Sequence, residues 1–471
     1  MKRRKRGNPA LKIALALAAL MIGALIAALV IVSSKSTVNI ITGQGKIITG
    51  EIKDKDNDTA YSYYESGGAA LLTPYREHGL GVGMVGEVVV PYAECTSSKI
   101  ENNLSDPLNS PLARGTVDRI VSVGGTQDNP IYYLESGVKV NGDYLRVTEN
   151  GFLLPDNSLT YDTAETVNGG VKLKFHTDWV VPVQVTLAPQ AYYTGYLERI
   201  YNVEAFTAEY MDITFARTHV LDGMPDISAS DIVKKCEWID GTDGGTLRLY
   251  LRQTGAFFGW SYTLDKNGRF EFVIKKDIRQ DSTPTVILDA GHGGSDPGAS
   301  NDAGTVIESA MTLDIAKQTA DILSQKGIRV VMTRSEDTDV SLDSRIAITR
   351  KYAPDMFVSI HCDSAETASL FGTHTFYFKN YSAPLAASIQ SHMAQVYGAL
   401  YAADNAAAET ADKGIKFFPF AVTRVEECPS VLVECGYLSN ATDCEFINSA
   451  AGRLKIADAI AKGILEQLNV G

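Results

Sequence analysis

The last third of the chain alternates short apolar runs with longer stretches of helical periodicity. Strands are predicted at residues 285–289, 328–332, 356–360, 373–378 and 431–433. Helices are predicted at residues 309–326, 341–352, 383–400 and 452–468. This alternation predicts an α/β fold, with a mostly parallel twisted sheet and helices on both of its faces.

Between about residues 37 and 276 the pattern is mainly strand-like. Short segments rich in β-branched and aromatic residues, such as 270–274, are separated by Gly, Asn and Asp. Residues 265–268 lie between two such runs and predict a hairpin turn. A mainly β region is therefore expected before the α/β part, with two subdomains as one possible arrangement.

The N-terminus has a third pattern. Six Lys and Arg residues occur before residue 13, and residues 13–32 contain no charge. An apolar helix of this length crosses a hydrocarbon core of about 30 Å. Because the residues that follow make a poor cleavage site, a retained signal anchor is favoured over a cleaved signal peptide. The basic end stays in the cytoplasm, so the rest of the chain is expected outside it, or secreted if the signal is cleaved.

These patterns divide the 471 residues into three parts. Residues 1–36 are a basic stub and a signal-anchor transmembrane helix, residues 37–280 are a mainly β region, and residues 281–471 are a catalytic α/β domain. The formal net charge is −13, and the basic N-terminus makes the remainder more acidic still. Such a chain is a poor candidate for binding nucleic acid, because the phosphate backbone attracts basic surfaces.

The six cysteines lack the CxxC spacing of a structural zinc site. An exported compartment permits disulfides, so Cys428 could pair with Cys435 or Cys444. Buried free thiols are the alternative, and the sequence leaves both open.

Three of the apolar segments end in residues that bind metals or move protons. His292, His361 and Glu434 follow the strands predicted at 285–289, 356–360 and 431–433. Ligands of open α/β sheets bind outside the carboxyl ends of the strands, so these residues are expected at one edge. Glu308 begins the first predicted helix and faces the same edge.

Two histidines and a carboxylate form a common zinc site with one position left for water. Bound zinc lowers the pKa of that water to about 7 and polarises a carbonyl group. A second carboxylate beside the water acts as general base and passes the proton to a leaving amine. This set supports amide hydrolysis, but the pattern leaves open whether Glu308 or Glu434 is the ligand.

Several linked motifs resemble one family. They are DAGHGGSDPGA at 289–299, VSIHCD at 358–363 and VECGYLSN at 433–440, with shorter matches at 332–334, 341–345 and 413–414. Together they resemble the zinc-dependent N-acetylmuramoyl-L-alanine amidases, the amidase-3 family of cell-wall hydrolases, over roughly residues 284–468. The resemblance implies Zn²⁺ held by His292, Glu308 and His361, with Glu434 as the catalytic glutamate. It also implies peptidoglycan as substrate, cleaved at the amide between N-acetylmuramic acid and the L-alanine of the stem peptide.

Two residues depart from the family pattern. Asp363 stands where Asn is frequent, and Lys413 stands where Arg is usual. Cys362 and Cys435 adjoin two site residues, but neighbouring side chains of a strand point to opposite faces. Neither thiol is therefore expected to reach the metal.

Other polar residues of this part are expected to support the site. Asp289 is predicted to orient His292 or its loop, as a group behind the ligands does. Arg334 and Arg345 are predicted to be structural ion-pair partners, with a grip on a substrate carboxylate as the alternative. A packing role is favoured for His374 over catalysis.

The leading hypothesis is a membrane-anchored, extracytoplasmic peptidoglycan amidase. A zinc peptidase that cuts within the stem peptide would use the same site, and a wall-binding protein with an inactive enzyme domain is the rival of another class. Residues 37–280 are expected to bind cell wall or to regulate the enzyme, because the chemistry needs no such addition.

Overall fold

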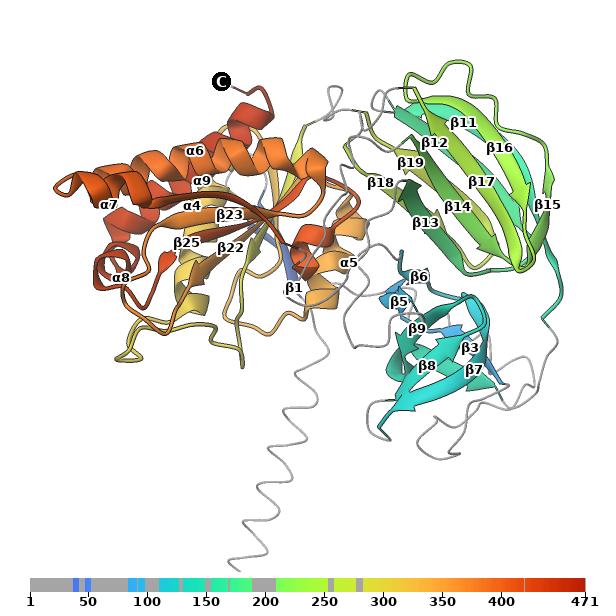
Figure 1. Cartoon of the computed structure of the whole chain (residues 1–471), viewed down its shortest axis with the longest axis horizontal. Coiled ribbons are helices and arrows are strands. Elements are labelled where there is room, and N and C mark those ends of the chain that lie inside the picture. Colours follow the sequence, from blue (N-terminus) through green and yellow to red (C-terminus); the bar gives the residue numbers. More distant parts are fainter. Residues whose placement is uncertain are drawn as a thin grey trace, which may run out of the picture.

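The computed structural model describes residues 37–41, 47–51, 84–90, 92–97, 110–126, 130–148, 154–167, 170–188, 209–252, 258–276, 283–418 and 420–470. The predicted anchor helix at 13–32 lies outside these residues. Within them, no helix combines the length and the apolar character that crossing a membrane requires. Figure 1 shows an α/β unit beside two β units.

The α/β unit is built on one sheet, which has eight strands among the described residues, in the order β2-β1-β21-β20-β22-β25-β23-β24. The strands are β1 (Thr37–Ile41), β2 (Ile47–Glu51), β20 (Thr285–Ala290), β21 (Arg329–Met332), β22 (Met356–Asp363), β23 (Thr373–Tyr377), β24 (Asp412–Phe417) and β25 (Ser430–Tyr437). Strands β21, β20, β22 and β25 are parallel to one another, as predicted. Strand β23 runs antiparallel to β25, and β24 is parallel to β23.

Strands β1 and β2 form a hairpin that extends this sheet. β1 pairs antiparallel with β21, so that Ile40 lies opposite Val331. The sequence pattern grouped residues 37–51 with the β region, but backbone pairing places them on the α/β sheet. A free edge strand such as β21 offers unpaired N–H and C=O groups, which the hairpin satisfies.

The two faces of the sheet are covered unequally (Figure 1). Helices α4 (Glu308–Gln325), α6 (Ala383–Leu400), α8 (Ala441–Asn448) and α9 (Ala450–Gln467) pack on one face around a large apolar core. The other face carries a smaller core with α5 (Leu342–Tyr352) and the short 3₁₀ helix η4 (Ala421–Arg424). Helices on both faces were predicted, and the predicted helices begin and end within two residues of the observed ones. The short helices α7 (Asn405–Thr410) and α8 were not predicted.

Alternation along the strands decides which side chains reach the thinly covered face. Cys362 and Cys435 belong to the large helix-covered core. Their neighbours His361 and Glu434 therefore point to the other face, where Leu432 packs in the smaller core. The prediction that the two thiols point away from the site is confirmed, and none of the six cysteines forms a disulfide.

The smaller β unit contains a six-stranded sheet among the described residues. Its strands are β3 (Val85–Val88), β5 (Cys95–Ser97), β7 (Val117–Gly125), β8 (Pro130–Leu134), β9 (Val138–Asn141) and β10 (Leu145–Thr148). A separate pair, β4 (Tyr92–Ala93) and β6 (Leu112–Ala113), accompanies it. Ile120, Tyr132 and Leu134 are buried in its core.

The larger β unit has two sheets with a common core. One sheet holds β11 (Asn157–Val167), β12 (Gly170–Thr177), β15 (Thr218–Asp222), β18 (Trp260–Leu264) and β19 (Arg269–Ile274). The other holds β13 (Val183–Ala188), β14 (Tyr210–Ala216), β16 (Val233–Asp240) and β17 (Gly244–Leu251). The hairpin predicted at 265–268 joins β18 to β19, with Leu264 opposite Phe270.

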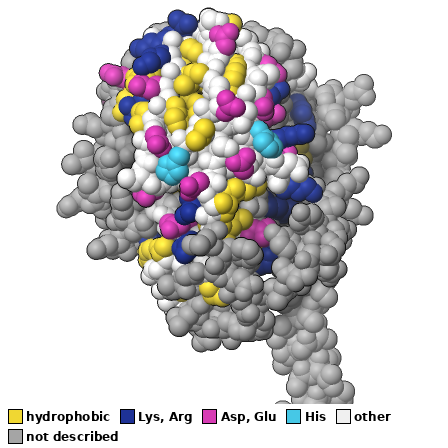
Figure 2. Space-filling model, turned by 90° about the vertical axis from the view of Figure 1, so that its right-hand side faces the viewer, with side chains coloured by type: hydrophobic (Ala, Val, Ile, Leu, Met, Phe, Trp, Pro, Cys, Tyr) yellow, Lys and Arg dark blue, Asp and Glu magenta, His cyan; other side chains and the backbone are white. Residues whose placement is uncertain are grey.

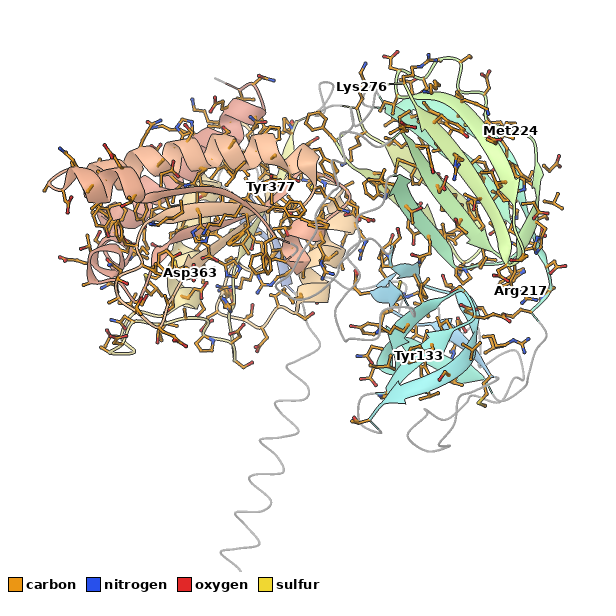
Figure 3. The ribbon with its side chains drawn as sticks, viewed as in Figure 1. Tyr133, Arg217, Met224, Lys276, Asp363 and Tyr377 are labelled. Atoms are coloured by element: carbon orange, nitrogen blue, oxygen red, sulfur yellow. The ribbon has the colours of Figure 1, made fainter. Side chains whose placement is uncertain are left out.

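The two β units contact each other through Arg217. Its guanidinium lies 3.0 Å from a carboxylate oxygen of Glu135, and Figure 3 shows Arg217 at the end of the larger unit that faces the smaller one. The outward side of this region carries scattered charges of both signs, with hydrophobic patches between them (Figure 2). On this face the charge pattern does not indicate a polyanionic partner.

Candidate active site

His292 lies in a tight loop that follows β20. Its backbone has φ of +58°, in the left-handed region that only special loops impose on a residue with a side chain. Arg345 donates a hydrogen bond of 2.9 Å to the carbonyl oxygen of His292. Arg334 donates one of 2.8 Å to the carbonyl oxygen of Gly291. Two buried guanidinium groups thus hold the loop in its strained conformation.

Glu308 is the first residue of α4, and its side chain is nearly buried. One carboxylate oxygen accepts hydrogen bonds from the backbone N–H of Cys362 at 2.9 Å, and the other from that of Ala299 at 2.7 Å. A carboxylate at the N-terminus of a helix also faces the positive end of the helix dipole. These contacts keep Glu308 in one position and in its charged form.

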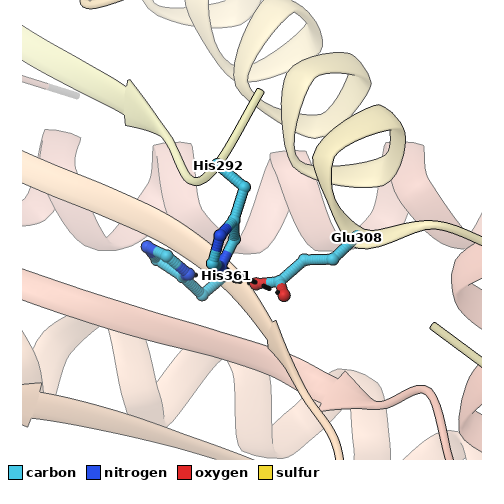
Figure 4. Close-up of side chains that lie close together, drawn as sticks. All are labelled: His292, Glu308 and His361. Atoms are coloured by element: carbon cyan, nitrogen blue, oxygen red, sulfur yellow. Dashed lines mark hydrogen bonds and ion pairs between the residues drawn. The ribbon is translucent and has the colours of Figure 1, made fainter. Parts of the chain in front are cut away.

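The two histidines lie next to each other, with ring centroids 4.9 Å apart, and both face the Glu308 carboxylate (Figure 4). His292 Nε2 lies 3.2 Å from Oε2, and His361 Nδ1 lies 3.0 Å from Oε1. One ligand atom from each of the three residues falls within 4.8 Å of the others. The other ring nitrogen of His292, Nδ1, lies 2.7 Å from a carboxylate oxygen of Asp296, which orients the ring. The structure therefore brings together three residues that could hold a metal ion.

Charge interactions within this group are strong. The hydrogen bond to Glu308 raises the pKa of His292 to about 9, against the opposing effect of burial. Burial alone would raise the pKa of Glu308, but the two histidines lower it well below its ordinary value. The carboxylate thus keeps its charge and favours a proton on His292, which a divalent cation would replace.

Two glycines let the ligands approach one another. A Cβ atom on Gly291 would lie 2.4 Å from the His361 ring. A Cβ atom on Gly298, whose φ is +67°, would lie 2.5 Å from a Glu308 oxygen and 2.6 Å from the His292 ring. Side chains at these two positions would occupy the space of the ligands, which explains why the motif requires glycine there.

Glu434 lies beside the three residues but is not one of the group. It is the direct neighbour of His361 in the pairing of β22 with β25. His292, His361 and Glu434 line the same cleft of about 680 Å³. Its other walls include Val340 and Phe420.

The carboxylate of Glu434 has an unusual environment. Its Oε2 is buried and accepts no hydrogen bond from the described residues. Burial, followed by the negative charges of Asp363 and Glu308, raises the pKa of Glu434 well above its ordinary value. A carboxyl group in this state is suited to holding and releasing a proton.

Asp289 and Arg345 form a buried ion pair behind the histidine loop. Asp289 also accepts hydrogen bonds from the hydroxyl groups of Thr333 at 2.6 Å and Ser359 at 2.7 Å. Arg345 binds Asp289 and the His292 carbonyl together, so the predicted supporting role of Asp289 is confirmed.

Neither arginine is available to grip a substrate. Arg334 is 1% exposed and donates to the backbone carbonyls of Ala290, Gly291 and Ser309, so its expected ion pair is replaced by backbone contacts. Arg345 forms its ion pair with Asp289, as predicted. The alternative of a substrate contact is therefore not supported.

Glu434 has further neighbours, on the side away from His292 and Glu308, that the sequence patterns did not indicate. His374 is 1% exposed and lies directly opposite Glu434 in the pairing of β23 with β25. Its Nε2 lies 3.6 Å from an Asp363 oxygen. Figure 3 shows Asp363 well apart from Tyr377, as the opposite directions of β22 and β23 require. His374 is therefore a buried packing residue, as expected, and it lies beside Glu434.

Comparisons with known proteins agree with this site. The family model for N-acetylmuramoyl-L-alanine amidase matches residues 286–466. The protein YqiI of Bacillus subtilis is 35% identical over 184 residues, which are 38% of this chain and 82% of that protein. The probable cell wall amidase LytH of Staphylococcus epidermidis is 32% identical over 243 residues, which are 50% of this chain and 73% of that protein.

A solved structure is also similar to part of this chain. The catalytic domain of CwlV, an N-acetylmuramoyl-L-alanine amidase from Bacillus (Paenibacillus) polymyxa var. colistinus, is 33% identical. The match covers 40% of this chain and all of that domain, with a TM-score of 0.36. On the family model and on LytH, of which the match covers 73%, the chain belongs to the N-acetylmuramoyl-L-alanine amidases and is an amide hydrolase of peptidoglycan.

Proposed function

We propose that the chain holds Zn²⁺ with His292, Glu308 and His361 and hydrolyses the amide between N-acetylmuramic acid and L-alanine. The supporting observation is that three nitrogen and oxygen ligand atoms lie within 4.8 Å of one another, beside an unpaired carboxyl group in the same cleft. Two imidazoles and one carboxylate are a usual donor set for catalytic zinc.

The residues divide the chemistry between them. When bound, Zn²⁺ supplies Lewis acidity to the scissile carbonyl group and lowers the pKa of water. Glu434 takes the proton of the attacking water and passes it to the nitrogen of the leaving L-alanine. Asp296 keeps Nδ1 of His292 protonated, which directs Nε2 toward Glu308.

The test is product analysis on purified peptidoglycan. We expect glycan strands without peptides and intact peptides with a new N-terminal L-alanine, and we expect the purified protein to contain about one zinc per chain. Shortened peptides that remain on the glycan would instead support a peptidase. An absence of both products, with wall binding retained, would favour an inactive wall-binding protein.

A variant separates the roles of the two glutamates. Glu434→Gln is expected to keep its zinc and to lose activity by about 10²–10⁴-fold, the usual contribution of an acid–base group. Glu445→Gln, on an exposed position of α8, is the matched control and should keep full activity. Near-normal activity of Glu434→Gln would show that another group moves the proton.

We further propose that the enzyme acts outside the cytoplasm, tethered to the membrane by residues 13–32. The support is the sequence pattern together with a wall polymer as substrate. Fractionation with alkaline washing tests it, because an anchored protein stays with the membrane and a secreted one appears in the medium.

The β region is proposed to target or regulate the enzyme. It contacts the segment that leads from the cleft wall to β25, because the backbone N–H of Trp260 donates a hydrogen bond of 2.8 Å to the Glu426 carbonyl oxygen. Hydrolysis and wall retention by the full chain, compared with those of a variant that lacks residues 84–276 but keeps β1 and β2, test this role. Equal hydrolysis and equal wall retention by the two proteins would rule out the proposed role of the β region.

A further inference from the structure

The substrate cleft is strongly acidic. Its lining includes the carboxyl groups of Asp296, Asp339 and Glu434, whereas Arg345 is the one arginine or lysine among its described lining residues. That guanidinium is already bound by Asp289 and by backbone carbonyl groups. An anionic substrate group must therefore find its positive partner elsewhere.

Lys413 and Lys416 lie on β24, beyond Glu434. The sheet order β20-β22-β25-β23-β24 places the histidines first, Glu434 next, and these lysines last. Lys416 pairs with Phe376 of β23, and His374, two residues earlier on that strand, pairs with Glu434. Since alternate residues share a face, Lys416 and Glu434 lie on the same thinly covered side of the sheet.

Aromatic rings connect the cleft with this lysine. Phe420 lines the cleft, and its ring lies 5.0 Å from that of Phe376. The Lys416 ammonium lies 5.8 Å from the Phe376 ring. A substrate that passes over these half-buried rings would reach Lys416 without crossing the core.

Neither lysine is neutralised by an ion pair within the described part of the chain. The Lys413 ammonium lies over the Phe371 ring at 4.8 Å, and neither ammonium has a carboxylate oxygen at ion-pair distance. Lys416 nevertheless acts on the site: burial lowers its pKa, whereas the carboxylates of Asp363 and Glu434 oppose that shift. Two lysines held near each other, with no carboxylate oxygen within ion-pair distance, are suited to an external anion.

The direction in which the leaving group extends decides which part of the substrate lies near Lys413 and Lys416. Glu434 must reach the leaving nitrogen within hydrogen-bond distance to protonate it. The acyl group lies at the histidines, so the peptide extends past Glu434 toward β23 and β24. One residue beyond L-alanine is about 7 Å from the scissile nitrogen in an extended chain, within reach of a lysine side chain.

We propose that Lys413 and Lys416 bind a carboxylate of the leaving peptide, so that the enzyme selects acidic stem peptides over amidated ones. This inference rests on the proposed amidase function and names the specificity of the same site. Lys416 is the principal contact because it faces Glu434's side of the sheet, and Lys413 adds to the local positive charge.

The test uses two N-acetylmuramoyl-L-alanyl peptides that differ in one group. The residue after L-alanine carries a free carboxylate in one peptide and a carboxamide in the other. We expect the wild type to prefer the carboxylate on the order of tenfold in kcat/KM, mainly through KM, as one charge-assisted hydrogen bond implies. In Lys416→Gln the ratio should fall to about one, and Lys416→Arg should restore part of it.

The ratio of the kcat/KM values for the two peptides excludes an indirect effect through Glu434. A change in the pKa of Glu434 alters both substrates alike and cancels in the ratio. The matched control is Lys455→Gln, an exposed lysine of α9 on the opposite face of the sheet, which should keep the wild-type ratio. A preference that survives in the double variant Lys413→Gln/Lys416→Gln, or its absence from the wild type, would overturn the proposal.

Binding separates this inference from the proposed function. The affinities of both peptides are measured in the Glu434→Gln background, with and without Lys416→Gln. If the wild type cleaves neither peptide but the affinity ratio depends on Lys416, the amidase proposal fails and the lysine assignment holds. If the wild type cleaves both peptides but Lys416→Gln leaves the affinity ratio unchanged, the amidase proposal holds and the lysine assignment fails.

Discussion

The guanidinium of Arg350 lies 3.2 Å from the carboxylate of Glu427. The same guanidinium lies 2.7 Å from the carboxylate of Glu94 in the smaller β unit. Arg350 belongs to α5, and Glu427 precedes the strand that carries Glu434. One nearly buried cation thus joins the β region, a helix of the catalytic domain and the segment behind the cleft.

Replacing Arg350 by Met is expected to destabilise the protein by about 3–5 kcal/mol, because it leaves the nearly buried carboxylate of Glu427 without a counter-charge. Denaturant unfolding of the full chain measures this. The control is Arg248→Met, which removes a more exposed pair with Asp212 and should lower stability by about 1 kcal/mol. Equal losses in the two variants would show that the junction is not a special point of stability.

Glu426 makes the stability of this junction depend on pH. Burial raises the pKa of Glu426 to about 8, although Lys379 opposes the shift. Because the folded-state pKa is raised, the stabilising contribution is complete below the ordinary value of 4.5 and is lost as pH rises through about 8. Glu426→Gln stays neutral and should flatten the fall in Tm between about pH 5 and pH 9. If Tm of the variant falls with pH as steeply as that of the wild type, another group causes the pH dependence.

Removal of the Glu308 charge is expected to abolish metal binding. Glu308→Gln loses the charge that faces both histidines, so zinc per chain should fall to near zero while circular dichroism stays close to the wild type. Asp296→Asn weakens only the support of His292 and should lower zinc affinity by about 10–100-fold. Titration against a chelator measures both, and full zinc in Glu308→Gln would contradict the assignment.

The Asp289–Arg345 pair should behave as one unit. Arg345→Met leaves a fully buried carboxylate unpaired and frees the His292 carbonyl, with an expected loss of about 3–5 kcal/mol in stability and weaker zinc binding. Adding Asp289→Asn should recover part of the stability but not the zinc affinity, because the loop stays free. Additive losses in this double-mutant cycle would mean that the two residues act separately.

Local sequence was sufficient for much of the catalytic domain. The longer helices and the central strands were predictable, because apolar residues recur with periods that one segment reveals alone. Helices α7 and α8 and strand β24 were not predicted. His292, His361 and Glu434 were predictable at one sheet edge because parallel strands bring their carboxyl ends together. Even so, β22 and β25 continue to Asp363 and Tyr437, so His361 and Glu434 lie inside strands and not beyond them.

Contacts between distant segments decided the rest. Residues alone could not choose between the two glutamates, whereas packing places Glu308 against both histidines and leaves Glu434 beside His374. Strand β23 runs antiparallel to β25 and carries β24, with Lys416, beyond Glu434. This depends on strand pairing that no local period encodes. The attachment of β1 to β21 has the same cause. Periodicity reports how a segment is buried, but only tertiary packing selects the partner that buries it.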